Sequence, residues 1–481
     1  MAMPASLRLG KVPQLASHSN SGEKAVSCLM RSLDRPCLVY ADSRGNIFDW
    51  PDWEMVGSSG GEHHRLAPGE WIPLPPGSEL FVLPGRLPVG YDPRRRQFEV
   101  MASDPQQEGQ AVQAVAAFIA PAHTQIYTAA YKSIPQRPLL PLFAYTALGW
   151  YRGEFVVSTV RVDPSERQDV RHFNQDRIAR NARRRLAEQR SNRLLQHLGR
   201  CALSYGCPAA RNYFLDRWEA PLPTSPICNS HCLGCISLQE RSDLCATQDR
   251  ISFVPSPQEI ADVAVPHLMQ APGAVVSFGQ GCEGEPLLQA ATIEEAIRLM
   301  RAATSRGTIH CNTNGSLPMA IQRLRGQGLD SIRVSINSCR PDYYNAYYRP
   351  HGYTFDDLKR SIQAIKGDGG YASINYLVMP GLTDEEAELA ALSHFIEETG
   401  VDLIQMRNLN IDPEWYLQSI GYQPKGPKLG MLVLMERLRQ VFPHLRFGYF
   451  NPCLEPAALA TESQPLRKRS KPQRKRSKRD R

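Results

Sequence analysis

The chain has 481 residues, of which 42% are hydrophobic and 22% charged, as in ordinary globular proteins rather than disordered ones. Its length exceeds what one hydrophobic core usually organises, so we expect more than one domain. The sequence contains no apolar run long enough to span a bilayer, and its first residues lack the apolar stretch of a secretion signal. Membrane spanning and export are therefore disfavoured, and the cytoplasm is the expected compartment.

The formal net charge of +8 comes from the last residues. Segment 467–481 contains ten of the 56 Lys and Arg residues and one of the 48 Asp and Glu residues, which leaves 46 basic and 47 acidic residues elsewhere. We expect residues 451–481 to form a disordered basic tail. Such a tail would bind RNA or another polyanion, or it would only increase solubility, and composition leaves both interpretations open.

The first part of the chain is predicted to be rich in β-structure. Residues 1–23 contain many Ser and Gly residues and predict a flexible leader. Residues 24–165 contain short apolar runs separated by Pro and Gly, which predict a mainly β N-terminal domain. The segment ADSRGNIFDW (41–50) is its clearest hairpin, and we expect one helix near QAVQAVAAFIAPA (110–122).

A connecting segment follows at residues 166–206. Apolar residues recur there at helical spacing, from Ile178 to Leu198, which predicts one long basic helix. Residues 171–200 include nine Arg and two acidic residues. Either these arginines form a solvated face over a packed apolar stripe, or they face phosphate groups.

From residue 207 to residue 450, strand-like and helix-like segments alternate. Such alternation requires parallel strands joined by helical crossovers, and the number of units predicts an α/β fold with a partial (βα)6 TIM-like barrel. Functional side chains are expected where each strand ends. After a short first strand near residue 221, the strand-like runs are 274–279, 308–315, 331–337, 372–379, 402–408 and 445–450.

The twelve cysteines are many for a reducing compartment, where cysteines bind metal, react or pack rather than form disulfides. Only Cys228, Cys232 and Cys235 form a tight group, in a loop that follows the first predicted strand. Three thiolates on a four-iron cluster leave one iron open for another ligand. A structural zinc ion needs four ligands, and His231 or a remote cysteine would have to complete the set.

This group resembles the CxxxCxxC signature of the radical S-adenosylmethionine (SAM) superfamily, and the resemblance covers about residues 221–450. About fifty residues downstream, Gly284-Glu285-Pro286 follows the next predicted strand, where the family has a GGEP-like turn that binds the methionine amino group. Glu283 replaces the first glycine of that turn. The resemblance implies a [4Fe–4S] cluster held by the three cysteines, with Gly284 and Glu285 as cofactor contacts.

Polar residues at the ends of the next two predicted strands extend the resemblance. Asn312 and Asn314 belong to a segment similar to the family's TNG turn, and Ser335 and Asn337 lie where family members place polar groups against SAM. Many members have an aromatic residue before the third cysteine, where this chain has Gly234. The packing against adenine is therefore expected to come from another element.

The resemblance implies an enzyme in which a reduced cluster cleaves SAM to methionine and a 5′-deoxyadenosyl radical. This radical would abstract hydrogen from a substrate that the sequence does not identify. A one-electron donor of the flavodoxin or ferredoxin type is implied, and no membrane partner. The alternative is a non-catalytic iron–sulfur or zinc protein in which the barrel binds nucleic acid.

Two further groups of residues remain open to interpretation. The tyrosines at positions 343, 344, 347 and 348 would line the substrate entrance or only pack a loop onto the barrel. Six of the remaining cysteines show no recognisable spacing for a second cluster: Cys201, Cys207, Cys245, Cys282, Cys311 and Cys339. Cys282, Cys311 and Cys339 lie at or near predicted strand ends, where they would contact a substrate or, as we expect, be buried as small apolar residues.

Overall fold

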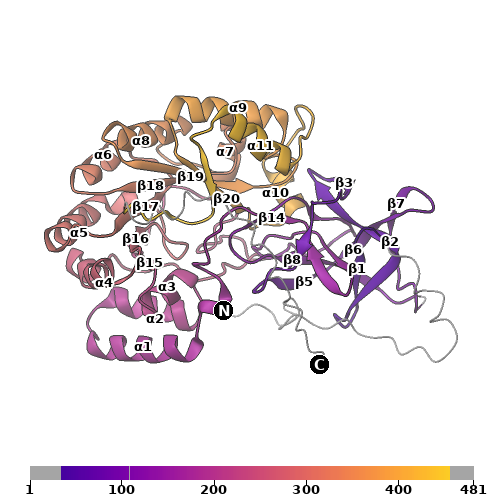
Figure 1. The fold of residues 1–481 in the computed structure, drawn as a ribbon, viewed down its shortest axis with the longest axis horizontal. Helices are drawn as coiled ribbons and strands as arrows, with labels where there is room; N and C mark the ends of the chain where they lie inside the picture. Colours follow the sequence, from indigo (N-terminus) through magenta and orange to yellow (C-terminus); the bar gives the residue numbers. More distant parts are fainter. Residues whose placement is uncertain (1–33, 108, 456–481) are drawn as a thin grey trace, which may run out of the picture.

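The computed structural model describes residues 34–107 and 109–455, and the predicted leader and the basic residues of the predicted tail lie outside them. In the described part, none of the helices combines the length and the apolar character needed to cross a bilayer. Figure 1 shows two parts side by side, a strand-rich N-terminal part and a larger part in which helices surround a sheet.

The N-terminal part is mainly β, as predicted, and most of its strands belong to one twelve-stranded sheet. The predicted hairpin is confirmed, because β1 and β2 pair antiparallel with Tyr40 opposite Phe48. The strands are β1 (Cys37–Asp42), β2 (Ile47–Ser59), β3 (Glu62–Arg65), β4 (Ile72–Pro73), β5 (Glu79–Leu83), β6 (Arg86–Asp92), β7 (Gln97–Val100), β8 (Val112–Phe118), β9 (His123–Gln125), β10 (Thr128–Ala129), β11 (Tyr131–Ser133), β12 (Leu148–Tyr151), β13 (Glu154–Val157) and β14 (Thr159–Arg161).

The helix expected at 110–122 is wrong, because strand β8 occupies this segment. β8 pairs with β1 on one edge and with β5 on the other. Its two faces are both buried: Val115 and Ala117 lie in one apolar cluster, and Ala114 and Ala116 lie in another. Strand pairing on two edges and burial on two faces outweigh the helix propensity of alanine.

The connecting segment forms two main helices rather than the single long helix that was predicted. α1 (Gln175–Glu188) ends at Gln189, and α2 (Arg193–Leu203) begins after Asn192. The Asn192 side chain accepts a hydrogen bond from the Leu195 amide at 2.9 Å, and this cap starts a new helix. Ile178 and Leu198 are buried while most of the arginines are exposed, which agrees with a solvated face over a packed stripe.

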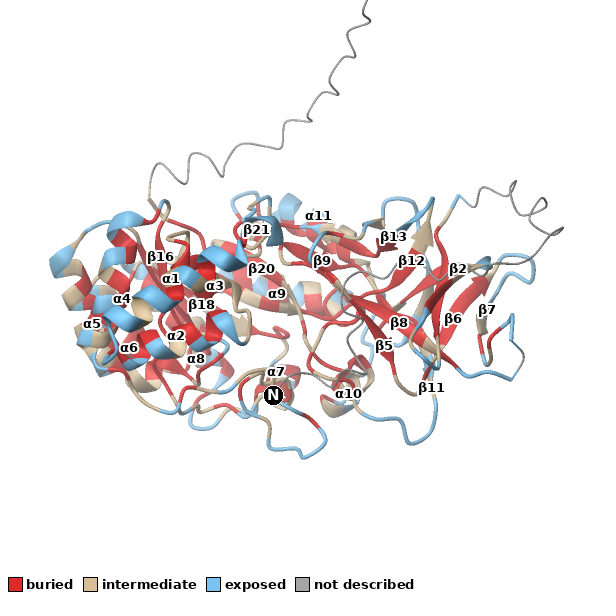
Figure 2. Ribbon diagram, turned by 90° about the horizontal axis from the view of Figure 1, so that it is seen from below, coloured by how far each residue is buried: buried red, intermediate tan, exposed pale blue. Residues whose placement is uncertain are grey.

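The larger part contains a curved sheet of seven parallel strands in sequential order. The partial (βα)6 barrel is confirmed, and Figure 2 shows its buried strands inside a layer of helices with exposed outer faces. The strands are β15 (Glu219–Pro221), β16 (Val275–Phe278), β17 (Thr308–Thr313), β18 (Ser331–Ile336), β19 (Tyr371–Val378), β20 (Leu403–Asn408) and β21 (Arg446–Gly448). The α-helices are α3 (Pro208–Phe214), α4 (Pro257–Gln270), α5 (Ala290–Ala303), α6 (Pro318–Gly326), α7 (Pro341–Tyr348), α8 (Phe355–Gly367), α9 (Glu386–Thr399), α10 (Pro413–Ser419) and α11 (Met431–Val441).

The packed part of the chain continues beyond residue 450, where the tail was predicted to begin. Asn451 is buried, and its amide oxygen accepts hydrogen bonds from Arg333 and Gln405. Its amide nitrogen donates to Glu219 at 3.1 Å, and Cys453 is fully buried. Polar side chains of the sheet pair with Asn451, so this residue belongs to the barrel and not to a tail.

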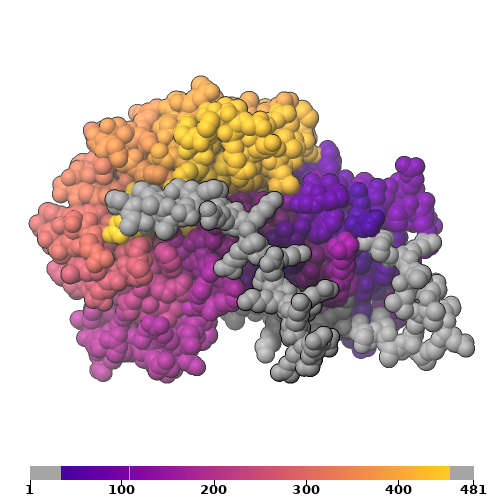
Figure 3. All heavy atoms as spheres, in the orientation of Figure 1, coloured from indigo at the N-terminus to yellow at the C-terminus, as the bar shows by residue number. Residues whose placement is uncertain are grey.

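The N-terminal part packs against the carboxyl ends of β19 and β20. The Thr124 hydroxyl donates to the carbonyl of Met406 at 2.6 Å, and the Gly60 amide donates to the carbonyl of Pro380 at 2.9 Å. In Figure 3 the N-terminal surface, drawn in purple, meets the yellow C-terminal surface of the barrel part. The two parts therefore share an interface at the edge of the sheet where functional residues are expected.

A buried ion pair crosses this interface. The Arg86 guanidinium lies 2.5 Å from the carboxylate of Asp412, and the two side chains are 0% and 1% exposed. Asp412 also caps α10 by accepting hydrogen bonds from the amides of Glu414 and Trp415. The N-terminal part is thus linked through this buried ion pair, and through a more exposed one between Arg137 and Glu414 at 2.6 Å, to the start of α10.

Replacement of Arg86 by Ala is expected to lower the free energy of unfolding by about 3–5 kcal/mol, because the buried charge of Asp412 loses its partner. Arg94→Ala is the matched control, since its ion pair with Asp52 is exposed and contributes at most about 1 kcal/mol. Chemical denaturation of the full chain measures both effects. Equal destabilisation by the two substitutions would contradict this account of the interface.

Candidate cluster and cofactor site

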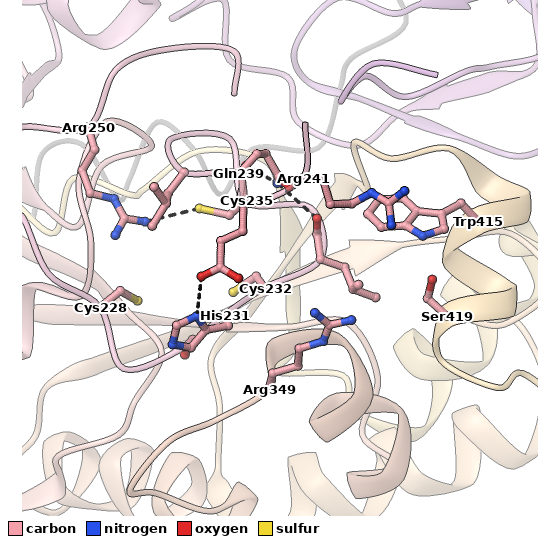
Figure 4. Close-up of a pocket in the computed structure, with 14 residues that line it drawn as sticks. Cys228, His231, Cys232, Cys235, Gln239, Arg241, Arg250, Arg349, Trp415 and Ser419 are labelled. Carbon is pink, nitrogen blue, oxygen red and sulfur yellow. Dashed lines mark hydrogen bonds and ion pairs between the residues drawn. The ribbon is translucent and has the colours of Figure 1, made fainter. Parts of the chain in front are cut away.

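A cavity of about 260 Å³ lies at the carboxyl ends of the parallel strands. Cys228, Cys232 and Cys235 all line it, from the irregular loop 222–256 between β15 and α4. Figure 4 shows the three sulfur atoms on one side of the cavity, with Trp415 and Ser419 of α10 on the opposite side. Every segment that forms the walls follows a strand, as expected for a functional site in this type of sheet.

The cysteine loop is held by main-chain hydrogen bonds to the segment around the end of α7. The amide of His231 donates to the carbonyl of Tyr348, and the amide of Leu233 donates to the carbonyl of Tyr347, both at 3.0 Å. A loop without regular structure satisfies its backbone groups in this way. The positions of the cysteines therefore depend on the segment that follows β18.

The Gly-Glu-Pro turn after β16 packs directly on the residues that precede the first cysteine. The Gly284 amide donates to the carbonyl of Ser225 at 2.7 Å, and the Glu285 amide donates to the carbonyl of Ile227 at 2.8 Å. A Cβ atom on residue 284 would lie 1.9 Å from the Ile227 oxygen. Only glycine fits here, because any side chain would push Ile227 and Cys228 away.

Glu283, which replaces the first glycine of the family turn, stabilises the same contact. Its buried carboxylate accepts hydrogen bonds from the amides of Thr224, Ser225 and Gln280 at 2.7–2.9 Å. Burial raises its pKa to about 7, although these three donors act in the opposite direction. Glu283, which departs from the family pattern, thus connects the turn to the start of the cysteine loop through hydrogen bonds.

The carboxylate of Glu285 is bound by the neighbouring strand end. It accepts hydrogen bonds from the hydroxyl of Thr313, from the amide of Asn314 at 2.8 Å and from the amide of Leu287 at 3.1 Å. Glu285 is 3% exposed, and burial raises its pKa to about 7. Its side chain therefore positions the turn after β17, and its expected contact with the methionine amino group stays a prediction.

The two asparagines at the end of β17, Asn312 within the strand and Asn314 after it, connect neighbouring segments of the site. The Asn314 side-chain amide donates to the Asn229 side chain at 2.7 Å and to the Ser230 hydroxyl at 3.0 Å. The Asn312 amide donates to the carbonyl of Gly279 at 2.8 Å, directly after β16. Asn314 thus reaches the cysteine loop, whereas Asn312 joins the ends of two adjacent strands.

Ser335 and Asn337 lie in β18 and directly after it. Ser335 accepts a hydrogen bond from Asn375 at 3.2 Å, and Asn337 donates to the hydroxyl of Tyr416 at 3.0 Å. Among the described residues, the side-chain oxygens of Asn337 and Asn375 and the hydroxyl of Tyr348 are buried without a partner. Unpaired buried acceptors are costly unless a ligand donates to them, so they suit a ligand rich in hydroxyl and amino groups.

An aromatic side chain reaches the place beside Gly234 from another element. A Cβ atom on Gly234 would lie 2.8 Å from the hydroxyl of Tyr347 in α7. Tyr347 packs edge-on against Tyr348 and Tyr416, and the four tyrosines of the α7 cluster are all buried. Of the two interpretations of this cluster, packing of the loop onto the barrel agrees with the structure.

The electrostatic surroundings of the thiols differ from one cysteine to the next. Burial raises the pKa of Cys228 to about 11 and that of Cys232 well above its usual value. The Arg250 guanidinium donates to the sulfur of Cys235 at 3.4 Å. Metal ions bind thiolates, so metal binding here would release protons.

Several cavity residues were not identified from the sequence. Arg241 and Arg250 lie in the cysteine loop itself, so their position close to the cysteines in the sequence could have identified them. Trp415 comes from a remote element and carries no motif, whereas Arg349 directly follows the tyrosine cluster that was considered for the substrate entrance. Arg241 pairs with Asp243 at 2.7 Å, and its guanidinium lies 5.5 Å from the ring centre of Trp415.

The comparisons with known proteins concern mainly the segment that contains this site. Residues 222–392 match the family model described as "Radical SAM superfamily". A GTP 3′,8-cyclase of Streptomyces coelicolor is 27% identical over 162 residues, which cover 32% of this chain and 46% of the relative. The FeMo cofactor biosynthesis protein NifB of Klebsiella pneumoniae is 24% identical over 241 residues, or 47% and 50% of the two chains. The chain thus spans about half the length of these curated relatives.

Solved structures with a similar arrangement include "Native anSMEcpe with bound AdoMet", at 18% identity and a TM-score of 0.33, covering 40% of this chain and 52% of that one. Another is Streptococcus suis SuiB bound to S-adenosylmethionine, at 13% identity and a TM-score of 0.34, with coverage of 50% and 54%. The family match defines the class of this segment: residues 222–392 form a domain of the radical SAM superfamily, whose cofactors are a [4Fe–4S] cluster and SAM.

Replacement of Gly284 by Ala is expected to displace the start of the cysteine loop, because the new methyl group would overlap the Ile227 carbonyl. In metal-free protein, alkylation of Cys228 followed by mass spectrometry should then be faster than in the wild type. Gly326→Ala is the control, since nothing lies near a Cβ atom at that position. An unchanged alkylation rate in Gly284→Ala would refute the proposed close packing.

Proposed function

We propose that Cys228, Cys232 and Cys235 hold a [4Fe–4S] cluster whose open iron binds SAM, and that the protein uses this site to modify a substrate by hydrogen abstraction. When bound and reduced, the cluster supplies the electron that cleaves SAM to methionine and a 5′-deoxyadenosyl radical. The observation that carries the proposal is the joint placement of the three sulfurs on one cavity, beside the Gly-Glu-Pro turn.

The spacing of the sulfurs supports a cluster rather than a single zinc ion. Thiolates on one tetrahedral zinc ion lie about 3.8 Å apart, given a zinc–sulfur bond of about 2.3 Å. In the described part of the chain, the sulfurs of these three cysteines do not all lie within 4.8 Å of one another. Their sulfurs are therefore spread too widely for one small ion, whereas a four-iron cluster binds its thiolates at separate iron atoms.

The chain's own residues would orient the cofactor. Glu283 and Asn314 fix the loops around the cysteines, and Arg250 places a positive charge beside Cys235. The buried side-chain oxygens of Asn337 and Asn375 have no partner and would accept hydrogen bonds from the hydroxyl or amino groups of a nucleoside. Preorganised polar groups of this kind position a ligand without a rearrangement of the loops.

The proposal includes a flavodoxin or ferredoxin as electron donor and a cytoplasmic location. Binding of RNA through the basic tail stays a prediction, since those residues lie outside the described part of the chain. The alternative, a non-catalytic metal protein that binds nucleic acid, has weaker support. A metal site with only a structural role needs no buried glutamate beside its cysteines, such as Glu285. The match to the family model also favours an enzyme.

Cys232→Ala is expected to abolish the formation of 5′-deoxyadenosine and to lower the iron content, because the cluster loses one of its three ligands. Anaerobic reconstitution, followed by iron analysis and chromatography of the SAM products, measures both. Cys245→Ala is the control, since this cysteine lies in the same loop but is exposed and outside the cavity. Normal SAM cleavage by Cys232→Ala would rule out the cluster assignment.

The wall opposite the cysteines supports an anionic substrate that has a flat ring. Arg241 and Arg349 place two cations on the cavity, and Trp415 offers an aromatic face. Two similar proteins are named as cyclases of GTP, a molecule with both features. GTP is therefore the first ligand to test with this chain.

Arg349→Gln is expected to weaken GTP binding about tenfold or more, because a charge-assisted hydrogen bond contributes about 1.5–3 kcal/mol. Isothermal titration calorimetry with GTP and guanosine separates the phosphate contribution from that of the base. The wild type should prefer GTP, and the variant should lose this preference. Arg94→Gln, on the exposed surface of the N-terminal part, is the control. Equal binding of GTP and guanosine by the wild type would contradict the anionic assignment.

A further inference from the structure

A second group of metal-ligand side chains lies outside the cavity. His197 and Cys201 are one turn apart on α2, and Cys282 lies in the loop after β16. The Nε2 atom of His197 is 3.5 Å from the sulfur of Cys201, and the ligand atoms of all three residues lie within 4.8 Å of one another. None of the three belongs to the group that lines the cavity.

The distances match those between ligands of one zinc ion. Zinc–sulfur and zinc–nitrogen bonds of about 2.3 Å and 2.0–2.1 Å, at tetrahedral angles, place sulfur and nitrogen about 3.6 Å apart. The observed separation of His197 and Cys201 is 3.5 Å. A hydrogen bond between these two residues explains that single distance, but it does not require Cys282 to converge on the same point.

The chemical nature of the donors favours the same ion. One imidazole and two thiols form a soft donor set, which binds zinc in preference to magnesium or calcium. Cys201 and Cys282 are 2% and 5% exposed and are free thiols, whereas His197 is half-buried. The site is thus sheltered by the fold and remains reachable from the side of His197.

Zinc binds thiols in their deprotonated form, so binding of the ion would release the protons of Cys201 and Cys282.

We propose that His197, Cys201 and Cys282 bind one Zn²⁺ ion, with water in the fourth position. The ion joins α2 to the loop that continues into Glu283 and Glu285. The ion therefore links the turn that supports the cysteine loop to helix α2, whether or not a cluster is present. Three protein ligands and one water molecule are a common arrangement for zinc that keeps an exchangeable position.

The test uses the full chain and measures zinc and iron together by plasma mass spectrometry after reconstitution. The wild type should contain about one zinc ion per chain in addition to the cluster iron. Cys201→Ser and Cys282→Ser should lose the zinc and keep most of the iron. Cys453→Ser is the matched control, since this thiol is also buried but lies away from the group, and it should keep the zinc.

A second measurement guards against variants that fail to fold. The triple variant Cys228→Ala, Cys232→Ala, Cys235→Ala cannot hold the cluster by the proposed ligands, so zinc that it retains belongs to another site. Addition of Co²⁺ to this variant should produce the visible bands of a tetrahedral ion with thiolate ligands. Wild-type protein without zinc, zinc that persists in both serine variants, or a Cys201–Cys282 disulfide would overturn the proposal. Failure of the cluster assignment alone would leave this result unchanged.

Discussion

The backbone of Gly284 lies against the carbonyl of Ile227, one residue before the first cysteine of the loop, and the rest of the site depends on this close approach. This contact fixes the position of the backbone directly before Cys228. Because a glycine is required at the contact, the turn after β16 and the cysteine loop behave as one unit. The tertiary structure, rather than the cysteine spacing, holds the three sulfurs on one side of the cavity.

Buried carboxylates support this unit at a cost in desolvation. Glu283 and Glu285 each accept three hydrogen bonds, which compensate for the removal of their charge from water. Their donors come from the cysteine loop, from the turn after β16 and from the end of β17. The site therefore relies on polar groups that no apolar side chain of similar size could replace, because the amides would lose their partners.

The N-terminal part contributes to the same edge of the barrel. It contacts the ends of β19 and β20, and Arg86 pairs with Asp412 at the start of α10. That helix carries Trp415, which forms the wall opposite the cysteines. A domain whose role was open from its sequence thus supports the part of the cavity that we assign to the substrate.

Some local signals in the sequence predicted parts of the fold correctly. The segments 331–337 and 402–408 form β18 and β20, since apolar runs between helical crossovers have few alternatives in an α/β protein. Ser256 and Glu259 form a capping box at the start of α4, because its partners are three residues apart in the sequence. The three closely spaced cysteines line one cavity, and the Gly-Glu-Pro turn packs against the residues that precede them. For such features the interacting residues are close in the sequence.

Interactions between remote residues were decided only by the tertiary structure. β8 became a strand because β1 and β5 pair with its two edges, although its alanines favour a helix. Trp415 lies on the cavity because the strand order brings α10 opposite the cysteine loop. Cys282 meets Cys201 across eighty residues of chain, and no spacing rule could pair them. The sequence alone determined the elements and the cofactor motif, whereas packing decided which side chains share a site.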